Sequence, residues 1–385
     1  MLRFLTAGES HGPGLVSTVE GIPAGLGFDA EGLSAELARR RLGYGRSPRM
    51  GLEQDRIEIL GGVRHGKTLG SPVSVLIRNT EYETKWSEEM SPAPGTPKRR
   101  MTTPRPGHAD LTGMLKYDTH DARDILERAS ARETAARTVV GYLSKLLIGH
   151  MGMTVLSHVV EIGTVRVPEG MPLPVADDLG SIDASPVRCL DAASAAQMEA
   201  EIRTARESRD TLGGVVEVLA FGVPAGLGSH VHWDRKIDGR FAQALMSVPA
   251  IKGVEIGEAF RQANSRGTQA HDEIFHDGDG FNRQTIRAGG TEGGMTMGEL
   301  IRIRAAMKPI STVMRSLESV DVDTKEATPA FFERSDTCAV PRAAVVCEQM
   351  VAFVLADEAL RKFGGDTIDD LVGAWERYAA RLTGF

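Results

Sequence analysis

The spacing of apolar residues along the chain predicts both strands and helices. Two segments that predict strands are residues 15–19 and the alternating segment at residues 73–78. Segments in which apolar residues recur every three or four positions predict helices, and the two longest cover residues 121–149 and 342–363. Turns rich in glycine and proline separate these elements. The pattern therefore indicates a fold that combines strands and helices.

Three of these features occur twice, in the same order. They are, first copy and then second, a Gly-Pro turn (residues 21–27 and 222–228), a glycine-rich hairpin (61–70 and 289–298) and a long helix (121–149 and 342–363). Coincidence is the alternative explanation, because the chain contains 43 glycines. We favour an internal duplication in which two strand–helix–hairpin–helix halves, about residues 15–150 and 215–365, share one core. The chain is therefore expected to form a single domain.

The first hairpin also matches the phosphate-loop pattern G-x-x-x-x-G-K-[ST], at residues 61–68. A kinase or NTPase built on Lys67 is therefore a second hypothesis. However, a phosphate loop opens a helix, whereas residues 69–72 lead into the alternating segment at 73–78. The second copy of the hairpin also lacks the Gly-Lys-Thr letters. These observations favour a backbone role for the glycines over nucleotide binding.

Composition and charge argue against several classes of protein. With a net charge of −7 and 5% aromatic residues, the chain lacks the basic field and stacking surface that nucleic acid or an anionic membrane would require. Three cysteines do not make a disulfide scaffold, and neither a signal peptide nor a run of 18 apolar residues is present. The histidines and acids at 230–232 and 271–280 lack the spacing of a closed metal site. We therefore expect a soluble cytoplasmic protein with no metal.

Five arginines and no acid lie between Glu36 and Glu53. The arginines at 39–41 end a predicted helix, where cations complement the helix dipole. That explanation does not extend to Arg46 and Arg49, which lie in a loop with glycine and proline. Because guanidinium groups bind phosphates and carboxylates in a bidentate manner, this segment is a candidate anion clamp.

A histidine in a stiff turn is the first candidate for acid–base chemistry. His108 lies in the segment Pro-Arg-Pro-Gly-His-Ala-Asp at 104–110, and the helix that follows carries Arg128 and Ser130. A rigid loop beside a cationic helix suits proton transfer to an anionic ligand, although such loops also end in ordinary surface histidines. Asp336 precedes the last long helix, either as a simple cap or as part of a site.

Six stretches of the sequence resemble the motifs of a single family. They are Gly-Glu-Ser-His-Gly at 8–12 with Glu-Gly-Ile-Pro at 20–23, Gly-Tyr-Gly-Arg at 43–46, Arg-Pro-Gly-His-Ala-Asp at 105–110, Glu-Arg-Ala-Ser-Ala-Arg-Glu-Thr at 127–134, Lys-Gly-Val-Glu-Ile-Gly at 252–257 and Arg-Ser-Asp-Thr-Cys-Ala-Val-Pro at 334–341. In these stretches the chain is similar to the chorismate synthases, and the resemblance extends over nearly the whole sequence.

This resemblance implies an α+β, single-domain sandwich with helices between two antiparallel β-sheets, assembled as a homotetramer. It also implies conversion of 5-enolpyruvylshikimate 3-phosphate to chorismate and phosphate with reduced FMN (FMNH2) and no net oxidation. NADPH is a candidate reductant of the flavin, and a separate flavin reductase is a candidate partner. The end of the sequence at Phe385, with no appended flavin-reductase domain, favours a bacterial monofunctional enzyme. A non-catalytic oligomer that binds an anion or a flavin is the third hypothesis.

The resemblance assigns catalytic roles to three residues. His11 would protonate the leaving phosphate, and His108 would protonate or polarise the reduced flavin. Asp336 would act with flavin N5 in removing the proton, and Arg334 would keep its carboxylate ionised.

The resemblance also implies a set of binding residues. Those for anionic groups of the substrate or of NADP(H) are Arg40, Arg46 and Arg49. Those for FMN are Arg128, Ala129, Ser130, Pro249, Ala250, Gly293, Lys308, Pro309, Ile310, Ser311, Thr312 and Arg334. Residues 81–105, with Trp86 as their one large apolar anchor, are expected to form a long mobile loop and are a candidate lid.

Overall fold

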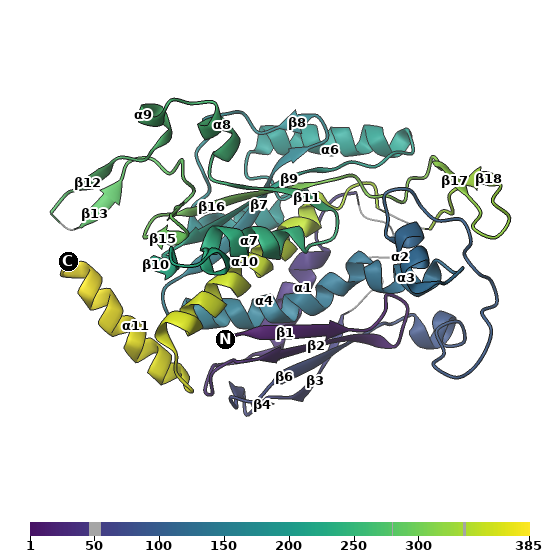
Figure 1. Cartoon of the computed structure of the whole chain (residues 1–385), viewed down its shortest axis with the longest axis horizontal. Helices are drawn as coiled ribbons and strands as arrows, with labels where there is room; N and C mark the ends of the chain where they lie inside the picture. The colour runs from purple at the N-terminus through teal and green to yellow at the C-terminus, as the bar shows by residue number, and fades with distance from the viewer. Residues whose placement is uncertain (46–54, 279, 334–335) are drawn as a thin grey trace.

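Two antiparallel sheets with helices between them form the body of the molecule (Figure 1). The computed structural model describes residues 1–45, 55–278, 280–333 and 336–385. In strand order, the first sheet contains β1 (Arg3–Ala7), β2 (Gly14–Glu20), β6 (Val73–Arg78) and β3 (Arg56–Gly61). The second contains β11 (Ile251–Ile256), β16 (Ile301–Met307), β9 (Gly214–Phe221), β7 (Thr154–Ile162) and β8 (Val165–Arg166).

Two long helices, α4 (Thr134–Gly149) and α10 (Val340–Phe363), pack against each other between the sheets. Helix α4 contacts β2 of the first sheet, and α10 contacts β7 and β9 of the second. Helices α1 (Ala30–Arg41) and α7 (Ile237–Met246) flank this pair. The facing side chains are fully buried, as expected from their helical spacing. The predicted α+β fold with antiparallel sheets is therefore confirmed.

Shorter elements complete the described part of the chain. The remaining helices are α2 (Asp110–Tyr117), α3 (Arg123–Ala129), α5 (Leu179–Ala184), α6 (Ala192–Glu207), α8 (Ala259–Ala263), α9 (Gly267–Ala270) and α11 (Ile368–Thr383). The remaining strands are β4 (Val63–Arg64), β5 (Lys67–Thr68), β10 (Ala225–Gly228), β12 (Ile274–His276), β13 (Phe281–Arg283), β14 (Thr291–Glu292), β15 (Met295–Met297), β17 (Glu318–Val320) and β18 (Ala327–Pro329). Within the described ranges, no helix is both long enough and apolar enough to span a membrane.

The two sheets share a strand order. Strands β2, β6 and β3 are neighbours in the first sheet, and β9, β16 and β11 are neighbours in the second, in the same chain order. The glycine-rich hairpins also correspond, because a Cβ at Gly62 or at Gly290 would lie 2.4 Å from a backbone oxygen, and both residues have positive φ. These glycines are required by the turns.

A threonine in each hairpin fastens the Gly-Pro turn beside it. The Thr68 hydroxyl donates to the Pro23 carbonyl at 2.6 Å and accepts from the Leu26 backbone N–H at 3.0 Å. Thr296 makes the same pair of bonds in the second half, at 2.6 and 2.9 Å. In the phosphate-loop hypothesis Thr68 would be a magnesium ligand, but its hydroxyl is buried in this structural role and a strand follows.

The single helix predicted for residues 121–149 is wrong in one respect. The chain is helical in α3 and α4, but Ser130 between them has extended backbone angles, φ −65° and ψ 142°. Its hydroxyl accepts a hydrogen bond from the Arg132 backbone N–H and so begins a short 3-10 turn, Ala131–Glu133. A serine competes in this way with the helical hydrogen-bond pattern. The break places residues 129–132 along the wall of a cavity.

Candidate active site

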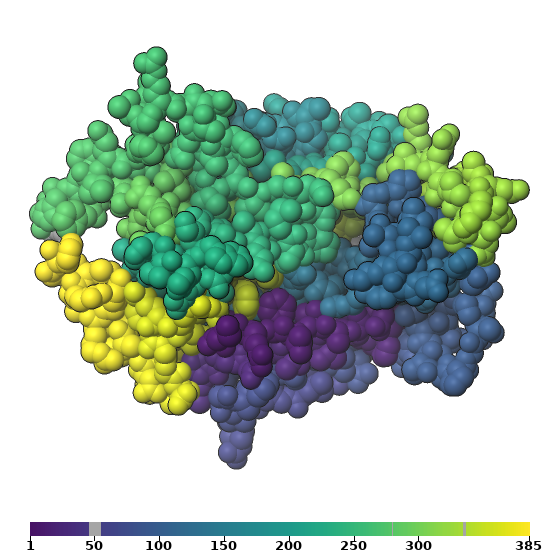
Figure 2. Space-filling view, viewed as in Figure 1, coloured from purple at the N-terminus to yellow at the C-terminus, as the bar shows by residue number. Residues whose placement is uncertain are grey.

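A cavity of about 520 Å³ lies where segments from all parts of the chain meet. It is bounded by the loop after β1, the turn at 105–109, the break between α3 and α4, the ends of β16 and α7, and the first turns of α10. The surface is visibly recessed between α7 (green) and the α2–α3 segment (blue) in Figure 2. His11, His108 and Asp336 all line this one cavity, together with Arg40.

His11 is held by a carboxylate from a distant helix. It lies in the loop between β1 and β2 and is 6% exposed. Its ring Nδ1 is 2.8 Å from Glu127 Oε1, and its backbone N–H donates to Glu127 Oε2 at 2.8 Å. The Trp86 ring lies on the imidazole, with centroids 4.0 Å apart. Both the backbone and the imidazole ring of His11 are therefore held in place.

Glu127 is itself held ionised at the end of α3. The Arg123 guanidinium donates to its Oε1 at 2.8 Å from one helical turn away. Burial raises the pKa of Glu127, but the hydrogen bonds from His11 and the charge of Arg123 outweigh it, so this pKa lies below its usual value. Glu127 belongs to the family motif at residues 127–134, but the sequence alone did not predict a role for it.

His108 is held by a carboxylate from its own turn. Its Nδ1 contacts Asp110 at the start of α2, and Asp110 also accepts from the Arg105 Nε at 2.8 Å. Burial raises the pKa of Asp110, but hydrogen bonds from His108 and Arg105 together lower it to about 2. Arg105 further donates to the Thr312 hydroxyl at 2.9 Å. Neither Asp110 nor Arg105 was singled out from the sequence.

Asp336 lies just before α10 and pairs with Arg342 in the first turns of that helix. It is not the helix cap, because Ala339 occupies that position. Arg334, which was expected to keep Asp336 ionised, lies outside the described residues, and Arg342 is the cation seen beside it. Arg40 is 4% exposed and donates to the Thr134 hydroxyl at 3.3 Å. Arg46 and Arg49 also lie outside the described residues.

Most of the residues expected to bind FMN lie around the same cavity. Those that line it are Ala129, Ser130, Pro249, Ala250, Lys308, Pro309, Ile310, Ser311 and Thr312. Gly293 is not among the lining residues; it lies in the turn between β14 and β15. The flavin-binding roles of all twelve residues that the resemblance implies remain predictions.

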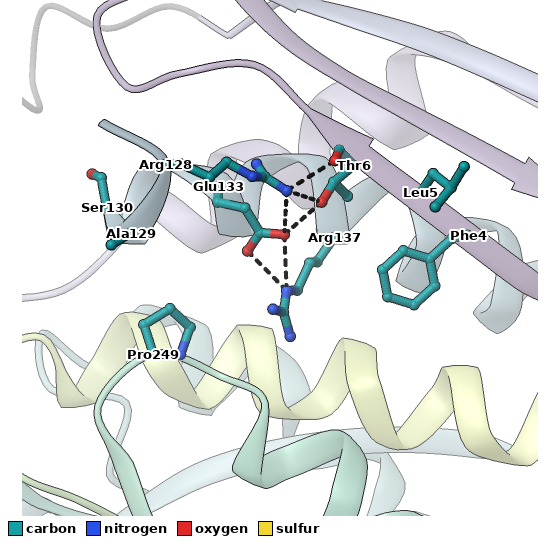
Figure 3. A pocket seen from close by; sticks show the side chains of 9 residues that line it. All are labelled: Phe4, Leu5, Thr6, Arg128, Ala129, Ser130, Glu133, Arg137 and Pro249. Carbon is teal, nitrogen blue, oxygen red and sulfur yellow. Dashed lines mark hydrogen bonds and ion pairs between the residues drawn. The ribbon is translucent and has the colours of Figure 1, made fainter. Parts of the chain in front are cut away.

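Arg128 faces a second, more open hollow of about 440 Å³, which shares Ala129, Ser130 and Pro249 with the first (Figure 3). Its guanidinium donates to the Thr6 carbonyl at 2.9 Å and to the Thr6 hydroxyl at 2.6 Å. Glu133 lies between the side chains of Arg128 and Arg137 in this hollow. Arg128 is therefore placed beside the cavity of the two histidines and does not line it.

Three comparisons with known proteins identify the same family. The sequence model of the family "Chorismate synthase" matches residues 2–360. The chorismate synthase of Frankia casuarinae is 57% identical over 394 residues, covering 99% of this chain and 99% of the relative. That of Salinispora tropica is 57% identical over 378 residues, covering 96% of each.

A crystal structure of a chorismate synthase has a TM-score of 0.81 to this chain, with 41% sequence identity. The likeness covers 100% of this chain and 99% of that one. Sequence and fold thus agree over nearly the full length, and they include the segments that surround the cavity. This chain belongs to the chorismate synthase family.

Proposed function

We propose that this chain converts 5-enolpyruvylshikimate 3-phosphate to chorismate and phosphate by a 1,4-anti elimination. Family membership supports the reaction, because relatives that are 57% identical over nearly full length bear the enzyme's name. One structural observation carries it further: two imidazoles, a carboxylate and buried arginines line a single cavity. Expelling a phosphate while removing a proton from carbon requires an acid at one end of the substrate and a base at the other.

The resemblance assigns the acid and the base, and their surroundings support this assignment. His11 delivers a proton to the departing phosphate, because its ring is fixed by Glu127 and lies near cationic groups that attract the anion. Asp336 takes the proton from carbon, and its carboxylate pairs with Arg342 in the first turns of α10. His108 would protonate or polarise the reduced flavin, and it lines the cavity together with Lys308 and Thr312.

Reduced FMN is the cofactor that the family implies, and when bound it supplies electron density that eases phosphate departure. The cavity suits such a molecule in its chemistry and its size. Lys308, Ser311 and Thr312 offer a cation and two hydroxyls for a phosphate group, while Leu126, Met307 and Val346 offer apolar walls for a flat ring. Its volume of about 520 Å³ lies in the range of roughly 300–1,000 Å³ typical of small-molecule sites.

The substrate's phosphate and two carboxylates require several cations. Arg40, Arg132 and Arg342 line the cavity from α1, the α3–α4 break and α10. Arg40 and Arg132 are less than a tenth exposed, so water screens their charges poorly. Both also lie near the buried carboxylate of Asp55, at 3.8 and 2.5 Å, which offsets part of their charge. Arg46 and Arg49 are further candidates by resemblance.

The finer features of the fold and assembly are also proposals. The shared strand order and the matched Thr68 and Thr296 bonds support an internal duplication within a single domain, residues 1–385. The homotetramer follows from the resemblance, and light scattering on the purified protein would test it.

An anaerobic assay with chemically reduced FMN and the enolpyruvyl substrate tests the proposed function. Chorismate and phosphate should appear in equal amounts with the unmodified protein. Flavin binding without product would favour a non-catalytic flavin-binding protein. Magnesium-dependent ATP hydrolysis that disappears in Lys67→Ala would favour the phosphate-loop hypothesis.

A second arm of that assay concerns the reductant. NADPH supplied as the sole reductant yields chorismate only if the chain reduces its own flavin. Product that requires an added flavin reductase would instead identify a separate enzyme as the electron source.

A further inference from the structure

A carboxylate outside the predicted site, that of Glu127, holds His11 by two hydrogen bonds. Both oxygens of Glu127 bind the same residue, one at the ring Nδ1 and one at the backbone N–H, each at 2.8 Å. The Glu127 carbonyl also accepts from the Ser10 backbone N–H at 3.0 Å. The end of α3 thus fixes the His11 loop at three points, although 116 residues separate the two side chains in sequence.

The charge of Glu127 decides which ring nitrogen carries the proton. A carboxylate that is 4% exposed is costly unless it is compensated, and here two N–H groups of His11 and the Arg123 guanidinium compensate it. An ionised carboxylate only accepts hydrogen bonds, so Nδ1 must be the donor. In the neutral ring the other nitrogen, Nε2, is then an acceptor, and in the charged ring it holds the proton that can be transferred.

Trp86 and Arg123 also contact the His11–Glu127 pair. Trp86 covers one face of the imidazole, and the Arg123 guanidinium lies 5.1 Å from the Trp86 ring centroid. Arg123 also faces Glu89 and Glu333, at 3.9 and 3.6 Å. The titratable and charged side chains that line the cavity with His11 are Arg40, Arg105, His108, Arg132, Lys308, Glu333, Asp336 and Arg342.

We infer that Glu127 is a positioning residue for the reaction, which holds His11 in the form with the proton on Nδ1 and Nε2 serving the cavity. Arg123 acts through Glu127 by keeping its carboxylate ionised and by holding Trp86 on the ring. This inference rests on the proposed role of His11 as the acid. A residue that merely stabilised the loop would not determine the tautomer.

The test combines selective ¹⁵N labelling of the histidines with steady-state kinetics on the full chain. The His11 signals are identified by their loss in His11→Asn. Spectra are recorded at a pH high enough for the imidazole to be neutral. In the unmodified protein the Nδ1–H form should dominate. In Glu127→Gln the amide has a single acceptor oxygen for two donors, so the Nε2–H form should gain population. Under reduced FMN, kcat should fall on the order of 10²-fold with KM nearly unchanged.

Two further variants separate positioning from folding. Glu127→Asp keeps the charge and should recover part of the lost kcat, whereas Asp124→Asn changes an exposed carboxylate on the same helix and should leave both readouts unchanged. A dominant Nε2–H form in the unmodified protein overturns the inference without any Glu127 variant. An unaltered tautomer and kcat in Glu127→Gln overturn it as well. If the unmodified protein makes no chorismate, the proposed function fails, yet the tautomer measurement still decides the positioning role.

Discussion

The two histidines of the cavity are held in the same chemical way by different parts of the fold. In each case Nδ1 faces a buried carboxylate, an arginine binds that carboxylate, and the arginine stacks on an aromatic ring. The two sets are His11, Glu127, Arg123 and Trp86, and His108, Asp110, Arg105 and Phe331.

The sets differ in how far apart their members lie in sequence. Asp110 is two residues from His108, so a single turn delivers both, whereas Glu127 reaches His11 only after α3 packs against the β1–β2 loop. A contact within one turn involves a small loop-closure cost, and a contact over 116 residues depends on the whole tertiary structure. Substitutions elsewhere in the fold should therefore have little effect on the geometry of the His108 set and a larger effect on that of the His11 set.

The largest expected effect comes from removing either imidazole. In His11→Ala and in His108→Ala, kcat with chemically reduced FMN should fall about 10²- to 10⁴-fold, because each change deletes a proton-transfer group. His150→Ala is the control, since this histidine is exposed beyond the end of α4. Full activity in either cavity variant would show that the two histidines are not both required.

The next effect concerns stability and its pH dependence at Asp110. The pKa of this carboxyl is lowered from 3.8 to about 2, so the ionised form stabilises the fold above about pH 4, and this contribution disappears as the pH falls toward 2. Asp110→Asn should therefore lower the free energy of unfolding by about 2 kcal/mol at neutral pH. The difference from the unmodified protein should shrink in acid.

Urea unfolding at a series of pH values measures this contribution. The matched variant Glu127→Gln, whose parent carboxyl also has a lowered pKa, should show a deficit that shrinks in acid in the same direction. A deficit for Asp110→Asn that stays constant between neutral pH and acid would contradict the assignment of this effect to the ionised carboxylate.

The smallest effect is expected from the stacked aromatic rings. Trp86→Leu removes a ring that touches His11, and kcat should fall about 2- to 10-fold, because such aromatic contacts contribute roughly 0.5–1.5 kcal/mol. Phe331→Leu removes the ring beside Arg105, one contact further from its histidine, and kcat should change less. A larger fall in kcat for Phe331→Leu than for Trp86→Leu would contradict this expected order of effects.

Sequence reasoning identified the elements whose cause is local. The alternating strand β6, the helix α1 that ends at the arginines 39–41 and the long helix α10 follow from short-range patterns, and all three are confirmed. The matched glycine turns were likewise visible as repeated letters, because each turn requires glycine at a fixed position.

The missed features are two local ones that the periodicity of apolar residues does not reveal and one contact between distant segments. Helical periodicity continues through Ser130, and only the hydroxyl contact to Arg132 reveals the break. Nothing in the spacing of Glu127 indicates a partner 116 residues earlier in the chain. The short helix α2 was also missed, although it begins at the carboxylate that holds His108.

Helix α10 joins the binding site to the interior of the protein in a single rigid element. Ala339, Arg342, Ala343 and Val346 line the cavity at its start, and the following turns are buried against α4 and the second sheet. A molecule that occupies the cavity therefore rests on the same element that holds the layers together. Occupancy should raise the melting temperature of the entire chain in one cooperative transition, so that thermal-shift screening can rank inhibitors without a catalytic assay.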